Sequence, residues 1–289
     1  MAVLKRAISM DASAVSTVID ATDIVNEIEK IHKTSAVVSA GLGRLTIATS
    51  LIGYSLKGED DSVTLRMDGN GLTGALICVS DSHGNVKSYV SNPVVEIPLN
   101  PYGKLDVKGA IGTNGTLSVI KDLGLKEPYS GTVPIVSGEV AEDIANYFAT
   151  SEQTPTVCAL GVLVNPDLTI KRAGGFLIQL LPFASEEVIS AIEKNIKDIK
   201  PITTMLEEGQ TPEDIALSLL DGLQPNLLDE ANPTYKCDCS KERVQRALIS
   251  LGREELTKMA NEQNQTEVSC HFCNRKYIFS KEDILTLCE

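Results

Sequence analysis

The residues best suited to chemistry in this sequence are cysteines gathered near its end. Five of the seven cysteines lie in the last fifth of the 289 residues. Four of them form two close pairs, Cys237-x-Cys239 and Cys270-x-x-Cys273. Paired thiolates that converge on one point are the ligands of a tetrahedral zinc site, with Zn–S distances of about 2.3 Å. The spacing therefore predicts one Zn²⁺ per chain, held by Cys237, Cys239, Cys270 and Cys273.

The sequence around the second pair predicts a tight turn. Cys270 and Cys273 lie between the apolar residues Val268 and Tyr277, so we expect two strands joined by a zinc knuckle. In a knuckle, backbone amides face the two thiolates. His271 lies inside the pair, and we expect it to point away from the metal. The alternative, four unrelated free thiols, would leave this spacing unexplained.

The first pair is unusual because only Asp238 separates its two cysteines. Structural zinc sites commonly use C-x₂₋₄-C spacing, whereas one intervening residue keeps two sulfurs close with little slack. Zinc holds cysteines as thiolates, and the thiolate is the reactive form of the side chain. A zinc-bound pair is therefore protected by the metal and also prepared for oxidation.

The other cysteines show no such pattern. Cys78 and Cys158 lie in apolar stretches, and we interpret them as core residues. Cys288 lies outside the paired pattern, and we interpret it as incidental.

The sequence lacks most motifs of the common enzyme classes, and the one motif that matches is followed by the wrong type of secondary structure. G-x-S-x-G, P-loop and H-E-x-x-H patterns do not occur, and the three histidines lie far apart. Residues 69–74 match G-x-G-x-x-G, but a strand-like run follows where a dinucleotide site requires a helix. We interpret this segment as a turn between strands. A four-thiolate site leaves no open position for water, so the sequence predicts a protein that is not an enzyme.

Composition and charge exclude several classes of partner. The net charge is −13, with 26 basic and 39 acidic residues, which disfavours nucleic acid. There is no Trp, and aromatic residues make up 4%, so a base-stacking surface is not expected. The sequence shows neither a signal-peptide pattern nor an apolar run of membrane-spanning length. We therefore expect a cytoplasmic protein, in which cysteines bind metal or do redox chemistry.

The first 183 residues predict an α+β domain with mostly antiparallel or mixed sheets. A helix capped by Thr22 and a long buried helix over residues 35–56 come first. Short strand-like runs then follow one another mostly without helices between them, which favours antiparallel pairing. The expected strands cover residues 62–67, 75–80, 86–91, 94–99, 116–122, 132–137, 156–165 and 173–181, with a helix over 139–150.

An acidic linker and a small zinc domain complete the predicted organisation. Residues 184–232 contain 11 acidic and 3 basic residues and show helical periodicity after the predicted caps Ser185 and Thr211. Their Ile and Leu stripes need an apolar partner surface to be stable. Residues 233–289 carry nine acidic and nine basic residues, and we expect them to form a Cys₄ zinc domain with short helices.

Over essentially its whole length the chain resembles the 33 kDa chaperonin family, the redox-regulated bacterial heat-shock holdases. The two cysteine pairs and their spacer of about thirty residues are that family's signature. Segments of the first domain are also similar to family segments: residues 40–44, 89–93, 112–115 and 151–155.

The resemblance implies a function that composition and spacing do not reveal. It implies a stress-response chaperone that works without ATP, binds unfolded or oxidatively damaged client proteins and prevents their aggregation. It further implies that oxidants join Cys237 to Cys239 and Cys270 to Cys273 in redox-active disulfides. Zinc then leaves, and the zinc domain and linker unfold. A homodimer is one candidate for the activated form.

Spacing also suggests an order for these two disulfides. In an extended chain, Cα atoms two residues apart lie at about 6.6–7.2 Å, at or beyond the usual disulfide limit of about 6.8 Å. Cys237 and Cys239 therefore need a local bend, whereas the turn between Cys270 and Cys273 already meets the limit. We expect the second pair to oxidise first.

Three alternatives remain open at this stage. A zinc enzyme would need an open coordination position. A zinc-ribbon regulatory or nucleic-acid-binding protein would carry a basic rather than a neutral zinc domain. A thiol oxidoreductase would need its C-x-x-C at the start of a helix in a thioredoxin-like fold, whereas this pair is predicted in a turn between strands.

Overall fold

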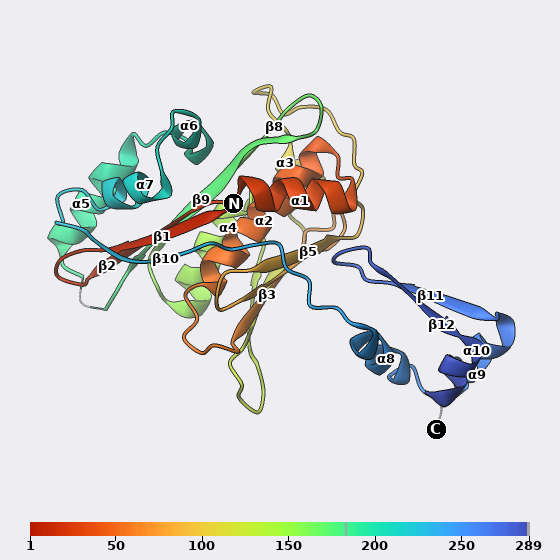
Figure 1. Ribbon diagram of the computed structural model, residues 1–289. Helices are drawn as coiled ribbons and strands as arrows, with labels where there is room; N and C mark the ends of the chain where they lie inside the picture. The colour runs from red at the N-terminus through yellow and green to blue at the C-terminus, as the bar shows by residue number, and fades with distance from the viewer. Residues whose placement is uncertain (183, 288–289) are drawn as a thin grey trace. The chain divides into compact units, whose positions relative to one another are not determined.

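Two five-stranded sheets form the framework of the first 235 residues in the computed structural model, which describes residues 1–182 and 184–287 (Figure 1). All neighbouring strands in both sheets pair in antiparallel orientation. The predicted α+β class with mostly antiparallel sheets is thus confirmed. The first sheet contains, in spatial order, β10 (Asn226–Ala231), β1 (Val3–Ile8), β2 (Ala14–Asp20), β9 (Ile170–Leu180) and β8 (Thr156–Val164). The second contains β5 (Val86–Val90), β4 (Leu76–Asp81), β3 (Ser62–Asp68), β6 (Thr116–Asp122) and β7 (Tyr129–Pro134).

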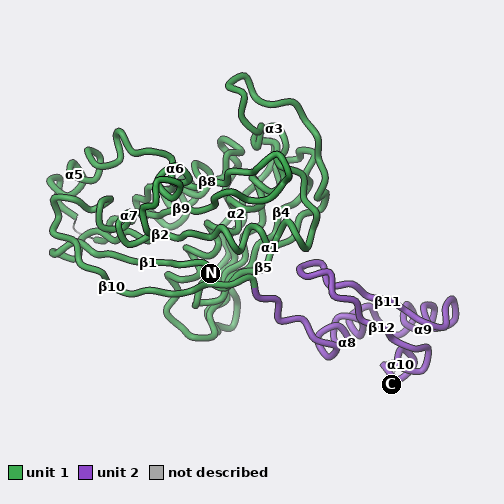
Figure 2. The backbone as a smooth tube through the Cα atoms, turned by 45° about the horizontal axis from the view of Figure 1, so that its top comes forward, with its two compact units in different colours: residues 1–235 green, residues 236–289 purple. Residues whose placement is uncertain are grey.

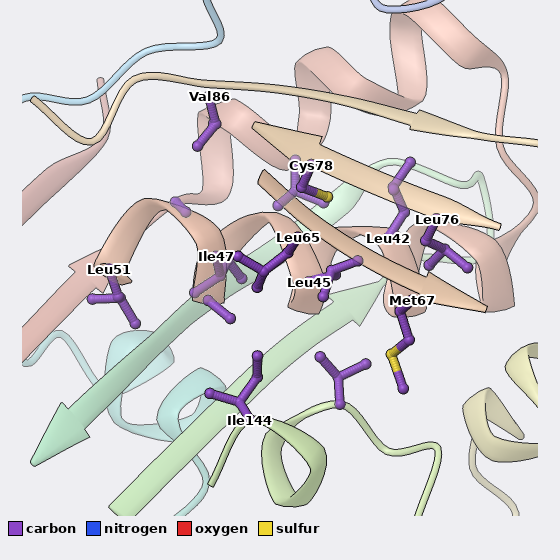
Figure 3. Close-up of a cluster of buried hydrophobic side chains, with 14 of the residues drawn as sticks. Leu42, Leu45, Ile47, Leu51, Leu65, Met67, Leu76, Cys78, Val86 and Ile144 are labelled. Atoms are coloured by element: carbon purple, nitrogen blue, oxygen red, sulfur yellow. The ribbon is translucent and has the colours of Figure 1, made fainter. Parts of the chain in front are cut away.

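Helix α2 (Ala36–Gly53) packs against strands of both sheets and is the centre of the core. Its leucines, among them Leu45 and Leu51, are buried, and Figure 3 shows them beside Leu65 and Cys78 of the second sheet. The long buried helix predicted from its apolar composition is therefore confirmed. Its length and composition would suit a membrane span, but 89% of it is buried inside the protein.

Three shorter helices complete the covering of this core. They are α1 (Thr22–His32), α3 (Val107–Ile111) and α4 (Ala141–Tyr147), the last continued by one π-helical turn, Phe148–Glu152. The only charged residue of α2, Arg44, donates to the carboxylate of Glu139 at 2.7 Å. Cys78 is fully buried in this core, as predicted.

The acidic segment packs on the first sheet through the apolar stripes that the sequence showed. Its helices are α5 (Glu186–Lys197), α6 (Ile202–Glu207) and α7 (Pro212–Leu219). Strand β9 is buried on both faces: Leu177 belongs to the cluster around α2, whereas Phe176 and Ile178 pack in the cluster with the acidic helices. The partner surface that these helices require is therefore the face of this sheet in the same unit. The capping box predicted at Thr211 is present, with Asp214 at its third position.

Residues from Lys236 onward form a second unit, drawn in purple in Figure 2. Its elements are α8 (Lys241–Ile249), α9 (Arg253–Glu262), β11 (Gln265–Ser269), β12 (Lys276–Ser280) and α10 (Lys281–Thr286). Ser240 and Ser280 cap α8 and α10, and these are the short helices that the sequence predicted for this domain. The cluster of buried apolar side chains in this unit is small. Among the described residues it consists of Leu248, Leu256, Ala260, Phe279 and Ile284.

Three local predictions differ from the structure. No strand forms over Val94–Leu99, because the N–H and C=O of Val95 bond to the hydroxyl of Ser35 instead of to a neighbouring strand. The strand expected at 132–137 lies three residues earlier, and the N–H groups of Val136 and Ser137 bond to Asp143.

Thr22 is not the cap of the first helix but its first residue, with Ala21 at the N-cap position. The Thr22 hydroxyl donates to the carboxylate of Asp20 at 2.6 Å, and its backbone N–H donates to the same oxygen at 3.0 Å. The Thr22 hydroxyl therefore bonds to Asp20, which precedes the helix, and does not accept a hydrogen bond from an N–H group of the first helical turn.

Strands β1, β2 and β10 were not predicted, and β10 replaces the end of the expected helical linker. In the pairing of β10 with β1, Glu230 lies opposite Lys5 and Asp229 opposite Arg6. The Arg6 guanidinium, which donates to Asp229, is the main cause of the lowered pKa of that carboxyl, and the Tyr54 hydroxyl donates to it at 3.1 Å. Backbone pairing and opposite charges thus stabilise a strand that local periodicity does not indicate.

Close packing of α2 yields a stability prediction. A Cβ added at Gly43 would lie 2.8 Å from Val25 Cγ1 and 3.0 Å from Val162 Cγ2, and β-branched side chains yield little because χ1 is restricted. Gly43→Ala should therefore lower the free energy of unfolding, since overpacking costs about 1–3 kcal/mol and the helix-propensity gain is about 1 kcal/mol. Urea denaturation measures the difference.

Gly41→Ala in the same helix is the matched control. Its added Cβ would lie 3.2 Å from Ile111 Cδ1, the end of a flexible side chain, so its effect should be clearly smaller. Equal effects of the two substitutions would contradict the packing described for α2.

Candidate metal centre

The sulfur atoms of Cys237, Cys239, Cys270 and Cys273 all lie within 4.8 Å of one another. Across the two pairs, Cys237 Sγ lies 3.7 Å from Cys270 Sγ, and Cys239 Sγ lies 3.4 Å from Cys273 Sγ. All four are free thiols and half-buried. The structure thus brings together the four cysteines that the spacing selected.

The first pair lies in an extended segment directly before α8. Ser240, which follows Cys239, caps that helix by accepting the N–H of Arg243 at 3.2 Å. Arg243 returns across the turn and pairs with the carboxylate of Asp238, the residue between the two cysteines. The start of α8 therefore fixes the segment from which both sulfurs project.

The second pair lies in the turn between β11 and β12, as predicted. The N–H of Cys270 donates to the carbonyl of Arg275 at 2.9 Å, and the N–H of Asn274 donates to the carbonyl of Cys270 at 2.8 Å. Asn274 adopts the left-handed conformation, with φ of 55°, which Asn tolerates better than most residues. These bonds close the knuckle and leave its sulfurs on one side.

Hydrogen-bond donors aimed at the sulfurs match a set of metal-bound thiolates. The N–H of Cys239 faces the sulfur of Cys237, and the N–H of Arg275 faces that of Cys273. The Tyr277 hydroxyl donates to Cys239 Sγ at 3.1 Å. In a tetrahedron with Zn–S bonds of about 2.3 Å the sulfurs are about 3.8 Å apart, close to the distances found between the pairs. The residues present therefore fit a tetrahedral thiophilic metal ion.

Burial and hydrogen bonding give the thiols different acidities. Burial raises the pKa of Cys237 to about 12 and also raises that of Cys273. Burial acts in the same direction on Cys239, but the Tyr277 hydroxyl and the neighbouring thiols lower its pKa to about 7. Because a metal binds thiolates, it must displace protons from the more basic thiols, so its affinity should rise with pH.

Three other residues were considered in the sequence: His271, Cys158 and Cys288. Among the described residues, His271 is not one of the grouped ligands, as predicted. Cys158 is half-buried in β8, where burial raises the pKa of its thiol. Cys288 lies outside the described residues.

Two residues of the site were not identified from the sequence. Tyr277 was interpreted only as an apolar strand residue, and Asn274 only as part of the run after the second pair. The signal for Asn274 was its place directly after a C-x-x-C turn, where a left-handed residue is favoured. Nothing local in the sequence indicates that the Tyr277 hydroxyl meets a cysteine 38 residues earlier.

Comparisons with known proteins agree along almost the whole chain. A family model described as Hsp33 protein matches residues 3–280. The 33 kDa chaperonin of Clostridioides difficile is 47% identical over 282 residues, covering 98% of this chain and 97% of the relative. That of Clostridium beijerinckii is 50% identical over 263 residues, covering 91% and 90%.

A solved structure agrees as closely. The crystal structure of the 33 kDa chaperonin (heat shock protein 33 homolog) of Thermotoga maritima matches with a TM-score of 0.91 at 38% identity. The match covers 99% of this chain and 97% of that protein. Both units thus have their counterpart in one solved chain.

The knuckle geometry predicts unequal effects at Asn274. Asn274→Val should destabilise the metal-loaded second unit by about 1–2 kcal/mol, the cost of a left-handed conformation for a side-chain-bearing residue. Asn274→Gly should have almost no effect, because glycine adopts this conformation freely. Thermal unfolding of both metal-loaded variants makes the comparison, and equal stability would contradict the turn described here.

Proposed function

Because the chain belongs to the Hsp33 family of chaperones, we propose that it is a redox-regulated holdase that binds unfolding proteins without ATP. The observation that carries the redox part is the cluster of four reduced sulfurs within 4.8 Å. Under this proposal the cysteines detect oxidant, and clients bind only after the second unit has changed. Its partners are unfolded client proteins, and its compartment is the cytoplasm.

We assign the metal as one Zn²⁺ held by Cys237, Cys239, Cys270 and Cys273. Bound there, it would keep the four sulfurs as thiolates and supply most of the stability of the second unit. With four protein ligands no position is open for a substrate, which supports a regulatory rather than a catalytic centre. A zinc-ribbon regulatory protein remains the alternative, disfavoured by the acidic chain.

Oxidation should unfold the second unit because its apolar core is small. Among its described residues, five apolar side chains form the buried cluster, whereas a structural zinc contributes about 10–16 kcal/mol. Disulfides Cys237–Cys239 and Cys270–Cys273 would remove all four thiolate ligands. They close loops of only a few residues, so they constrain the unfolded chain little and do not replace the lost stability.

Unfolding can then continue into the end of the first unit. Tyr235, its last residue, donates to the carbonyl of Ser88 at 3.1 Å, and Val86 N–H donates to the carbonyl of Thr234 at 3.0 Å. Further back, edge strand β10 carries the exposed side chains Leu227 and Leu228. Release of this segment would free the edge of β1 beside these apolar residues, and free edges and apolar surface are the features that bind unfolded chains.

The test of this proposal measures zinc and chaperone activity together. Reduced protein should contain one zinc per chain, and peroxide at elevated temperature should release it and switch on suppression of client aggregation. Cys270→Ser with Cys273→Ser should abolish zinc binding, because two of four ligands are lost. Cys288→Ser, outside the predicted ligand set, is the control and should behave as wild type. Zinc content that is unaffected by the double substitution would refute the assignment.

Truncation tests whether the second unit restrains the first. A chain that lacks residues 233–289 keeps both sheets and lacks Thr234 and Tyr235, whose bonds to Val86 and Ser88 hold the end of the first unit, so it should fold with that restraint removed. It should suppress client aggregation without oxidant, whereas the reduced full-length chain should not. A folded truncated chain that is inert towards clients would contradict restraint by the second unit.

A further inference from the structure

Tyr277 makes an unusual connection within the second unit. It lies on β12 opposite Val268, and its ring packs against the small apolar core of that unit. Its hydroxyl donates to Cys239 Sγ at 3.1 Å. The ring is thus held by the hairpin β11–β12, and the hydrogen bond reaches a sulfur on a different segment of the chain.

The backbone donors to two of the other sulfurs are local by comparison. The sulfur of Cys237 is faced by the N–H of Cys239, two residues away, and the sulfur of Cys273 by the N–H of Arg275. Such bonds belong to each pair's own turn. The bond from Tyr277 to Cys239 spans 38 residues, so it exists only while the hairpin and the first pair are folded against each other.

We propose that Tyr277 is a positioning residue that delays oxidation of the first cysteine pair until the hairpin β11–β12 loosens. The inference rests on the proposed redox function. A thiolate attacks peroxide with a sulfur lone pair, and a hydroxyl donating to that sulfur occupies electron density needed for the attack. Partners of metal ligands also orient them and increase metal retention.

The step balances with peroxide as the oxidant. Two thiolates, one hydrogen peroxide and two protons give one disulfide and two waters. One sulfur attacks a peroxide oxygen and breaks the O–O bond, and the second sulfur then displaces hydroxide from the sulfenic acid. The two cysteines lose two electrons, and peroxide is reduced to water. Tyr277 is not consumed and acts only on the sulfur of Cys239.

This placement makes the switch respond to two signals together. Oxidant alone is enough to oxidise the pair Cys270–Cys273, because the Tyr277 hydroxyl donates its hydrogen bond to Cys239 instead. Completion at Cys237–Cys239 requires that the hairpin also loosen, which heat promotes. Because of the Tyr277 hydroxyl, neither oxidant nor heat by itself completes the oxidation of both cysteine pairs.

The experiment follows both disulfides in Tyr277→Phe, which keeps the ring and removes only the hydroxyl. Zinc-loaded full-length protein is treated with mild peroxide at low temperature, free thiols are alkylated at intervals, and each disulfide is quantified by mass spectrometry. Formation of Cys237–Cys239 should accelerate about tenfold, the lower range for loss of a partner of a metal ligand. The rate at Cys270–Cys273 should stay unchanged. Zinc content and circular dichroism before peroxide verify the starting state.

Tyr102→Phe is the matched control, because Tyr102 is 87% exposed in the first unit, and it should leave both rates unchanged. Equal acceleration of both pairs in Tyr277→Phe would show a generally loosened site and overturn the proposal, as would no acceleration at all. If wild-type protein kept all four thiols under peroxide at every temperature, the redox function itself would be wrong. That outcome is distinct from unchanged rates in the variant.

Discussion

The convergence of four cysteine sulfurs is the constraint on which the second unit depends. Among the described residues its buried apolar cluster consists of Leu248, Leu256, Ala260, Phe279 and Ile284, with a few partly buried neighbours. This is little for about fifty residues to remain folded without a staple. The sulfurs connect the extended segment before α8 to the turn between β11 and β12. A unit that depends on one cluster of oxidisable ligands has a stability that oxidants can remove, which is the physical basis of the proposed switch.

The first unit is built in the opposite way. Helix α2 packs between two sheets with almost every side chain buried, and β9 is buried on both faces. Stability there is distributed over many apolar contacts, so loss of one segment need not unfold the rest. The acidic helices pack in a second apolar cluster, on the other face of β9, through Ile192, Ile215 and Leu219. A robust unit next to a conditionally stable one suits a protein that must keep one part folded while the other changes.

The chain between these two extremes is held mainly by polar contacts. Strand β10 pairs with β1 through backbone bonds and the oppositely charged pairs Lys5–Glu230 and Arg6–Asp229, and Tyr235 bonds to the backbone of Ser88. Partly exposed ion pairs contribute little individually and are screened by salt. Apart from the packing of Ala231 and Tyr235 against the main core, this segment therefore has little apolar stabilisation.

The sequence by itself identified the four cysteines that meet in space and the mainly antiparallel α+β class. Cysteine spacing, turn residues and apolar periodicity are local signals, and they sufficed for Cys237, Cys239, Cys270, Cys273, the buried helix α2 and the cap of α7. Tertiary structure alone decided strand β10, because its pairing with β1 joins the two ends of the first unit and depends on partners more than 200 residues apart. Strands β1 and β2 pair with each other within residues 3–20, and the apolar pattern of that segment was not recognised as a hairpin. Tertiary structure also decided that the acidic helices pack on β9 and that the Tyr277 hydroxyl bonds to Cys239. Contacts between residues far apart in the chain produce no periodic pattern in the sequence around either partner, so they cannot be predicted from it.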